Sequence, residues 1–233
     1  MRLLSYDQLW QTVWGDQQYF GPVHRHILEH LVCTVSSLNV RSVLDVGCGS
    51  GDNLAALASL GRYELTGVDI SQEALTLARP RVPSACLFLL DIEHQSLPEQ
   101  FDLVVCIQVV EHLLDDMAAL RNIARAARRY VLISTIQGRM RASELAIGHV
   151  RNYSAVELGS KLELAGLEVM KMWGWGFPFY SPLYRSLVEW LPGGPPARSL
   201  GPAGRIAART LYHLYRLNWP GRGDILNVLA TAP

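Results

Sequence analysis

The sequence of 233 residues predicts an α/β fold with a doubly wound, mostly parallel sheet. Short apolar runs alternate with runs whose apolar residues have helical spacing along residues 42–135. The apolar runs are nearly continuous, which is expected for strands with helices over both faces. The length suffices for one such domain with a good core, or for one domain and a small appendage.

Each predicted element is bounded by a change in this pattern. A first helix is predicted over His24–Leu38, before the alternation begins. The predicted strands are Ser42–Val46, Glu64–Asp69, Cys86–Leu90, Phe101–Ile107, Tyr130–Thr135, Leu167–Trp173 and Asp224–Thr231. The predicted helices between them are Asn53–Leu60, Gln72–Arg79, Asp115–Ala127 and Ser154–Ala165, the last with Ser154 and Glu157 as a capping box. Residues 137–153 are predicted to be a polar loop.

Two parts of the chain lie outside the alternating region. Residues 1–40 are predicted to form an N-terminal helical cap, in which Trp10–Gly21 acts as a lid through Trp14, Tyr19 and Phe20. Residues 41–233 form the main domain, with an insertion at residues 174–223 before the last strand. The aromatic residues around the start of that insertion are as compatible with a substrate wall as with plain core: Trp173, Trp175, Phe177, Phe179, Tyr180 and Tyr184.

Composition narrows the function classes. The chain has 21 Lys and Arg against 21 Asp and Glu, and no basic stripe with aromatics follows the core domain, so nucleic-acid binding is not expected. The insertion carries a net positive charge. Its helical stretch Arg205–Leu217 is interpreted as a helix packed on the domain, with its basic side in solvent, rather than as a membrane-surface helix. No signal peptide or apolar span is recognised, so a cytoplasmic location is expected. No metal site is predicted, because the cysteines form no CxxC pair and His26 and His30 have no third ligand nearby.

A glycine loop follows the first predicted strand. Residues 45–51 read Asp-Val-Gly-Cys-Gly-Ser-Gly and open onto a helix. Glycines at such a turn let a ligand approach the main-chain N–H groups, and the helix N-terminus favours polar or negative ligand groups. The spacing is GxGxG, and Asp52 stands where a dinucleotide fingerprint requires its last glycine. A dehydrogenase is therefore disfavoured.

Acidic residues follow the next two predicted strands, at Asp69 and Asp91, and a Phe-Asp-Leu-Val run ends in Glu111-His112-Leu113. With the acid and glycines of the loop, these features resemble the four motifs of the class I S-adenosylmethionine-dependent methyltransferases over about residues 40–175. The resemblance implies a Rossmann-like, seven-stranded sheet with an antiparallel last strand. It also implies a bound S-adenosylmethionine that is released as S-adenosylhomocysteine.

The resemblance assigns cofactor roles residue by residue. The methionine part would lie at the loop, and Asp69 would accept the ribose hydroxyls, although Asp69 or Ser71 could instead cap the next helix. Asp91 would face the adenine amino group, with Ile92 beside the ring. The full predicted set is Tyr19, Asp45, Gly47, Cys48, Gly49, Gly51, Asp69, Ile70, Asp91, Ile92 and Gln108.

Methyl transfer needs a base only where the acceptor must lose a proton. The candidates are His112, just past the fourth strand, and His149 in the His-Val-Arg-Asn-Tyr-Ser run, which resembles small-molecule members of the family. The leading hypothesis is therefore methylation of O or N in a small organic acceptor. A cofactor-binding protein without transferase activity and a nucleotide-dependent oxidoreductase are the alternatives. The sequence carries no signal for an oligomeric state.

Overall fold

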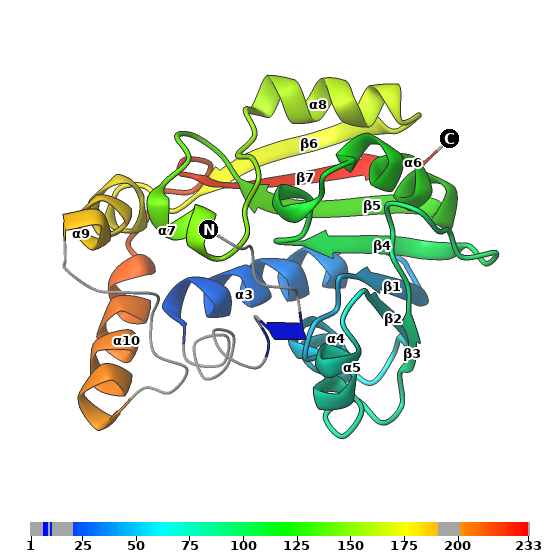
Figure 1. The fold of residues 1–233 in the computed structure, drawn as a ribbon, viewed down its shortest axis with the longest axis horizontal. Coiled ribbons are helices and arrows are strands. Elements are labelled where there is room, and N and C mark those ends of the chain that lie inside the picture. The colour runs from blue at the N-terminus through cyan, green and yellow to red at the C-terminus, as the bar shows by residue number, and fades with distance from the viewer. Residues whose placement is uncertain (1–6, 9, 11–20, 191–200, 233) are drawn as a thin grey trace.

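The computed structural model describes residues 7–8, 10, 21–190 and 201–232 of the chain. Its centre is one seven-stranded sheet in the order β3-β2-β1-β4-β5-β7-β6 (Figure 1). The strands are β1 (Ser42–Val46), β2 (Glu64–Asp69), β3 (Cys86–Leu89), β4 (Phe101–Ile107), β5 (Ala127–Ile136), β6 (Glu168–Trp175) and β7 (Ile225–Thr231). The first five strands pair in parallel, and β7 runs antiparallel between β5 and β6. The predicted fold class, including the antiparallel last strand, is confirmed.

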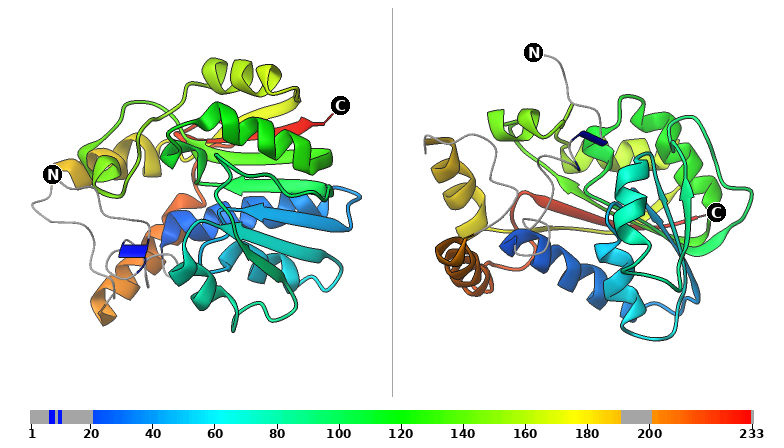
Figure 2. Two further views of the ribbon diagram at one scale, coloured as in Figure 1. Left: turned by 45° about the vertical axis from the view of Figure 1, so that its right-hand side comes forward. Right: turned by 60° about the horizontal axis from the view of Figure 1, so that its bottom comes forward.

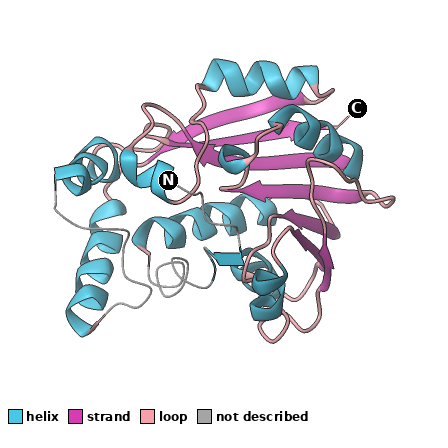
Figure 3. Cartoon of the chain, viewed as in Figure 1, coloured by secondary structure: helices cyan, strands magenta, loops and turns pink. Residues whose placement is uncertain are grey.

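Helices cover both faces of the sheet (Figure 3). They are α3 (Pro22–Ser36), α4 (Asp52–Ala58), α5 (Gln72–Ala78), α6 (Asp116–Ala126), α7 (Ala142–Ala146), α8 (Ala155–Leu164), α9 (Arg185–Trp190) and α10 (Pro202–Tyr215), with the short turns η1 (Val110–His112) and η2 (Phe179–Tyr184). Within the described residues, no helix is both long and apolar enough to cross a bilayer.

The core has two layers because successive residues of a buried strand point to opposite faces. On one face α6 packs on β4 and β5 while α8 packs on β6, and Leu120, Leu158 and Val104 belong to this layer of the core. On the other face α3, α4 and α5 pack through residues such as Leu31 and Leu54. Helix α3 is thus part of the main core, while the boundary drawn at residue 40 stays a prediction.

The loop after β5 differs from the sequence prediction. Residues 137–153 contain the short helix α7. Glu144 stabilises this helix, because one of its carboxylate oxygens accepts hydrogen bonds from the Arg141 backbone N–H and from Asn152 Nδ2, both at 2.9 Å. A side chain in the first turn that bonds back to the residue before the helix leaves no trace in the spacing of apolar residues. The sequence pattern therefore indicated only a polar loop.

Two aromatic residues at the start of the insertion, Trp175 and Tyr180, lie in the core. Trp175 and Tyr180 are 6% and 8% exposed and stack with ring centroids 6.0 Å apart. Tyr215 of α10 meets both rings edge-on, and His26 of α3 lies 4.8 Å from Trp175. None of these residues lines the pocket described below. The structure therefore supports the core interpretation over the substrate wall.

A buried ion network fixes the insertion to the rest of the domain. Arg185, at the start of α9, is 5% exposed and pairs with both Glu144 and Asp224. Glu144 lies in α7, and Asp224 immediately precedes β7. The network therefore joins α9, α7 and the end of the insertion at one point.

Candidate active site

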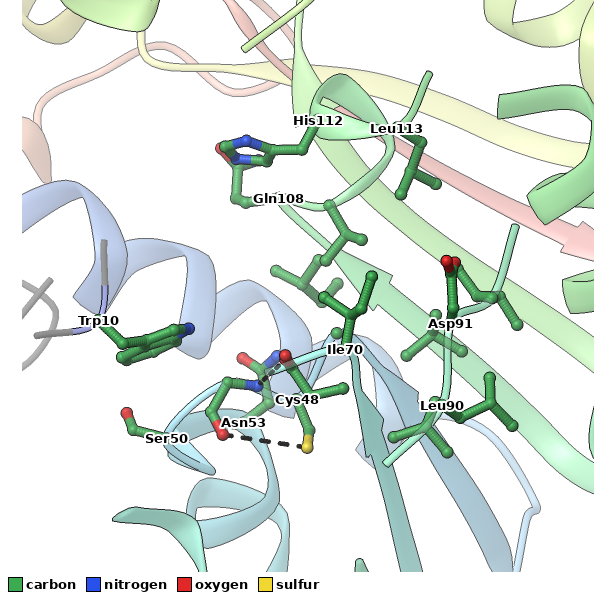
Figure 4. Close-up of a pocket in the computed structure, with 18 of the residues that line it drawn as sticks. Trp10, Cys48, Ser50, Asn53, Ile70, Leu90, Asp91, Gln108, His112 and Leu113 are labelled. Carbon is green, nitrogen blue, oxygen red and sulfur yellow. Dashed lines mark hydrogen bonds between the residues drawn. The ribbon is translucent and has the colours of Figure 1, made fainter. Parts of the chain in front are cut away.

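One pocket lies at the carboxyl ends of β1, β2 and β4, where open α/β sheets bind ligands (Figure 4). In the close-up, Trp10, Ser50 and Asn53 lie on one side, Leu90 and Asp91 on the other, and Gln108 and His112 at one end. The pocket brings together most of the predicted site residues: Gly47, Cys48, Gly49, Asp69, Ile70, Asp91, Ile92, Gln108, His112 and His149.

The glycine loop turns sharply between β1 and α4. Gly47 and Gly49 have φ values of +70° and +52°, in the left-handed region that favours glycine. A Cβ at Gly47 would lie 2.3 Å from Val109 Cγ2, and one at Gly49 would lie 2.7 Å from Trp10 Cζ2. The loop needs glycine here for both its backbone conformation and its close neighbours.

Asp69 holds this loop in place from the end of β2. Its carboxylate accepts the Gly49 N–H and the Ser71 N–H, both at 2.8 Å. Each carboxylate oxygen keeps a second lone pair that a ligand hydroxyl can use. Burial raises the pKa of Asp69, and these backbone N–H donors oppose the rise. Ser71 caps α5 by accepting the Ala74 N–H at 3.1 Å, so Asp69 is not needed as the cap.

Two predicted loop residues lie behind the pocket rather than in its wall. Asp45 is fully buried and accepts a hydrogen bond of 3.3 Å from Asn53 Nδ2, while its second oxygen has no partner among the described residues. Burial raises the pKa of Asp45 to about 8. Gly51 has φ +83° and packs near Ala78 and Val82, so it serves the turn into α4.

Asp91 lies at the opposite side of the pocket, after β3. Its oxygens accept the Glu93 N–H at 2.9 Å and lie 2.9 Å from His94 Nδ1. These contacts fix the turn that also places Ile92 in the pocket wall. Asp91 and Ile92 therefore both belong to the pocket wall.

Gln108 follows β4 with a φ of +57°, which is uncommon for a residue other than glycine. Its backbone N–H donates to the Ser134 carbonyl at 2.7 Å, and its side-chain amide lies 3.4 Å from the Ser134 hydroxyl. The bonds to β5 hold this strained turn, which carries Gln108 into the pocket wall.

His112 and His149 meet at the pocket, although 36 sequence positions separate them. Their ring centroids are 4.6 Å apart and the rings are nearly perpendicular. Burial lowers the pKa of His112 to about 3, with a further lowering by His149, and lowers the pKa of His149 to about 4. Both imidazoles are therefore neutral at neutral pH, which is the form that accepts a proton.

Glu111 lies behind this pair. It is 0% exposed and accepts a hydrogen bond of 2.7 Å from the Thr135 hydroxyl. Burial raises its pKa to about 7. One oxygen of Glu111 and one nitrogen of each histidine lie within 4.8 Å of one another, a donor set that a divalent ion can use. That no metal is held here stays a prediction.

The sequence reasoning missed part of the pocket wall. His24, Asn53, Glu93 and Leu113 all line it, and Trp10 lies over the glycine loop. Trp10 begins the segment predicted as a lid, Trp10–Gly21, but is not among the predicted cofactor residues. His24 comes from the helix before the first strand, where no motif marks a ligand contact. Helical spacing is the only signal at His24, and it indicates packing. The predicted cofactor residue Tyr19, with Trp14 and Phe20 of the proposed lid, lies outside the described residues.

Comparison with known proteins agrees with this geometry. Residues 44–133 match the family described as "Methyltransferase domain". A ubiquinone biosynthesis O-methyltransferase from Aeromonas salmonicida (strain A449) is 30% identical over an alignment of 199 positions, which covers 73% of this chain and 81% of the relative. The chain belongs to the class I S-adenosylmethionine-dependent methyltransferases. The predicted family is confirmed.

A second sequence relative and one solved structure are also similar to this chain. A ubiquinone biosynthesis O-methyltransferase from Hydrogenovibrio crunogenus is 28% identical over 155 residues, and the chain spans 64% of that relative's length. The N-methyltransferase NodS from Bradyrhizobium japonicum WM9, solved with S-adenosylhomocysteine, has a TM-score of 0.60 at 19% identity, with 99% of this chain and 94% of NodS covered. At that identity the likeness shows a shared fold.

Proposed function

We propose that this chain transfers a methyl group from S-adenosylmethionine to an oxygen or nitrogen of a small organic acceptor. The observation that carries the proposal is a single pocket in which the glycine loop and two carboxylates meet a pair of neutral imidazoles. The names of the relatives favour oxygen as the methylated atom.

The residues present fit the cofactor. Gly47 and Gly49 line the pocket, and a side chain at either position would meet Val109 or Trp10. Asp69 retains acceptor capacity beyond its two bonds to the loop. We infer that the loop would hold the methionine part, Asp69 the ribose hydroxyls, and Asp91 with Ile92 the adenine.

S-adenosylmethionine supplies a methyl group on a sulfonium sulfur, a leaving group that is already activated. The chain must therefore position the acceptor and, for a hydroxyl acceptor, remove its proton. His112 is the proposed base, and His149 the proposed contact to the acceptor. Burial keeps both rings neutral, so each retains a nitrogen lone pair at neutral pH.

The test combines cofactor binding with turnover. Calorimetry should show that the chain binds S-adenosylmethionine, and Asp69→Ala should weaken binding about 100-fold, because two hydrogen bonds to a carboxylate are lost. Glu168→Gln, at an exposed carboxylate at the start of β6, is the matched control and should bind as the wild type does.

An acceptor library of phenols, carboxylic acids and amines, read by mass spectrometry, should then yield a product heavier by one CH₂, together with S-adenosylhomocysteine. Cofactor binding without any methylated product would favour the alternative, a cofactor-binding protein without transferase activity. Unchanged affinity in Asp69→Ala would overturn the assigned cofactor orientation.

A further inference from the structure

Helix α10 presents a basic stripe and an apolar stripe side by side on its outer surface. Arg205, Arg209 and Arg216 are spaced by four and seven residues, so they follow one side of the helix. The same 100° rotation per residue places Ile206 and Leu214 on the side of the helix next to the arginines, and Leu217 follows two residues after the helix ends at Tyr215. Ile206 and Leu217 are 68% and 64% exposed, and the three arginines are exposed as well.

The inner side of α10 accounts for its packing and leaves these stripes uncovered. Ala208, Tyr212 and Tyr215 are buried, and Tyr212 stacks on His26 of α3. Both views in Figure 2 show α10 at the periphery of the molecule, beyond α3. The outer stripes are therefore not needed to hold the helix on the domain.

The chain continues this surface past the end of α10. Trp219 is 54% exposed and lies against Phe177, whose ring is also approached by Arg222 at 5.5 Å. Helix α10 contains no acidic residue. The Thr210 hydroxyl, in the apolar stripe, bonds to the Ile206 carbonyl at 3.1 Å, so its polarity is satisfied within the helix.

The basic and apolar stripes of α10 together indicate which kind of partner would bind this surface. Arginines beside exposed aliphatic residues and a tryptophan suit an anionic bilayer, where the charges meet headgroups and the apolar groups enter the acyl boundary. A nucleic acid would engage the arginines and leave Ile206 and Leu217 in water. Exposed Val156 and Leu164 of α8 form no such surface, because the charges of α8 are mixed in sign.

We propose that the outer side of α10, with Trp219, docks on the surface of an anionic lipid bilayer. The helix would lie in the plane of the interface, with Ile206 and Leu217 directed into the lipid and Arg209 and Arg216 among the headgroups. This proposal goes beyond methyl transfer and does not depend on it. The carboxyl ends of β4 and β5 point toward the side of the molecule where α7, α9 and α10 lie (Figure 1).

Flotation and co-sedimentation with vesicles test the proposal on the full chain. Vesicles of phosphatidylcholine with 30% phosphatidylglycerol should bind the chain, and vesicles of phosphatidylcholine alone should bind it at least about tenfold more weakly. Arg209→Gln/Arg216→Gln should reduce partitioning into anionic vesicles about 30-fold, since each arginine near such a surface contributes about fivefold. Ile206→Ser/Leu217→Ser should reduce it at least about tenfold.

Matched controls separate docking from general effects of charge and folding. Arg79→Gln/Arg121→Gln removes the same charge from exposed positions elsewhere, and Val156→Ser/Leu164→Ser removes exposed aliphatic groups from α8. Both controls should bind vesicles as the wild type does, and all variants should show the same thermal unfolding.

No binding of wild type to anionic vesicles would overturn the proposal. So would equal losses in test and control variants. A loss confined to the arginine variant would show that Ile206 and Leu217 do not enter the lipid, and would overturn the proposed orientation of the helix.

Discussion

The imidazole rings of His112 and His149 meet at 77° with their centroids 4.6 Å apart, at one end of the pocket. His112 is held by η1 at the end of β4, and His149 by the loop after α7. A proton acceptor and a second polar contact are thereby placed next to each other by elements that are distant in sequence.

Replacing either histidine should lower turnover without loss of cofactor binding. We expect His112→Ala to reduce kcat about 10²–10⁴-fold, the usual contribution of a positioned base. We expect His149→Ala mainly to raise KM for the acceptor. The affinity for S-adenosylmethionine, measured by calorimetry, should change less than about threefold in both. A kcat within about twofold of wild type in His112→Ala would exclude it as the base.

The pH dependence of kcat should reflect the lowered pKa values of the pair. Because the neutral imidazole is the active form and the pKa values are about 3 and about 4, activity should persist as pH falls from 8 to about 5. It should decline only below that range, as the rings become protonated. An acidic limb centred near pH 6.5, the ordinary histidine value, would show that the acting histidine is solvated.

Removing divalent ions should leave the rate unchanged. The proposed base acts through an imidazole lone pair, and an ion bound by Glu111, His112 and His149 would occupy it. Turnover before and after dialysis against EDTA is the measurement. A loss greater than about tenfold that added Mg²⁺ or Zn²⁺ restores would instead assign this cluster to a metal.

Glu111 should make the folded state less stable as pH rises. Its folded pKa of about 7 lies above the ordinary value of 4.5, so its stabilising contribution is complete below pH 4.5 and is lost as pH rises to about 7. Glu111→Gln removes this dependence. The variant should gain about 1–3 kcal/mol over wild type between pH 4 and pH 8, measured by urea unfolding. An identical pH dependence in the two proteins would contradict the raised pKa.

Gly47→Ala should disturb the loop more than a glycine substitution at an open turn. The new Cβ would lie 2.3 Å from Val109 Cγ2 in a backbone with φ +70°. Gly61→Ala is the control, because Gly61 has φ +66° but nothing within 4 Å of the new Cβ. The control should cost about 1 kcal/mol of unfolding free energy, and Gly47→Ala about 1–3 kcal/mol more, with weakened cofactor binding. Equal losses would mean that only the backbone conformation matters.

The sequence predicted the elements whose pattern is local. Apolar runs located every strand of the sheet, and the resemblance to the family motifs pointed to Asp69 and Asp91, which the structure places at one pocket. The place of His24 in the pocket could not be predicted, because it depends on how α3 packs beside the loop. Trp10 begins the predicted lid segment, but no pattern marked it as a pocket residue. The encounter of His112 with His149 depends on the path of residues 137–153, which no periodicity describes.

The buried network of Arg185 with Glu144 and Asp224 has a consequence for building chimeras. Residues 174–223 look like an exchangeable module because both ends join the sheet at strands. Yet the arginine lies inside the module, while its two carboxylate partners lie outside. A donor module without a cation at position 185 would leave Glu144 buried without its charge partner, beside the loop that carries His149. Grafts between relatives should therefore exchange all three residues together.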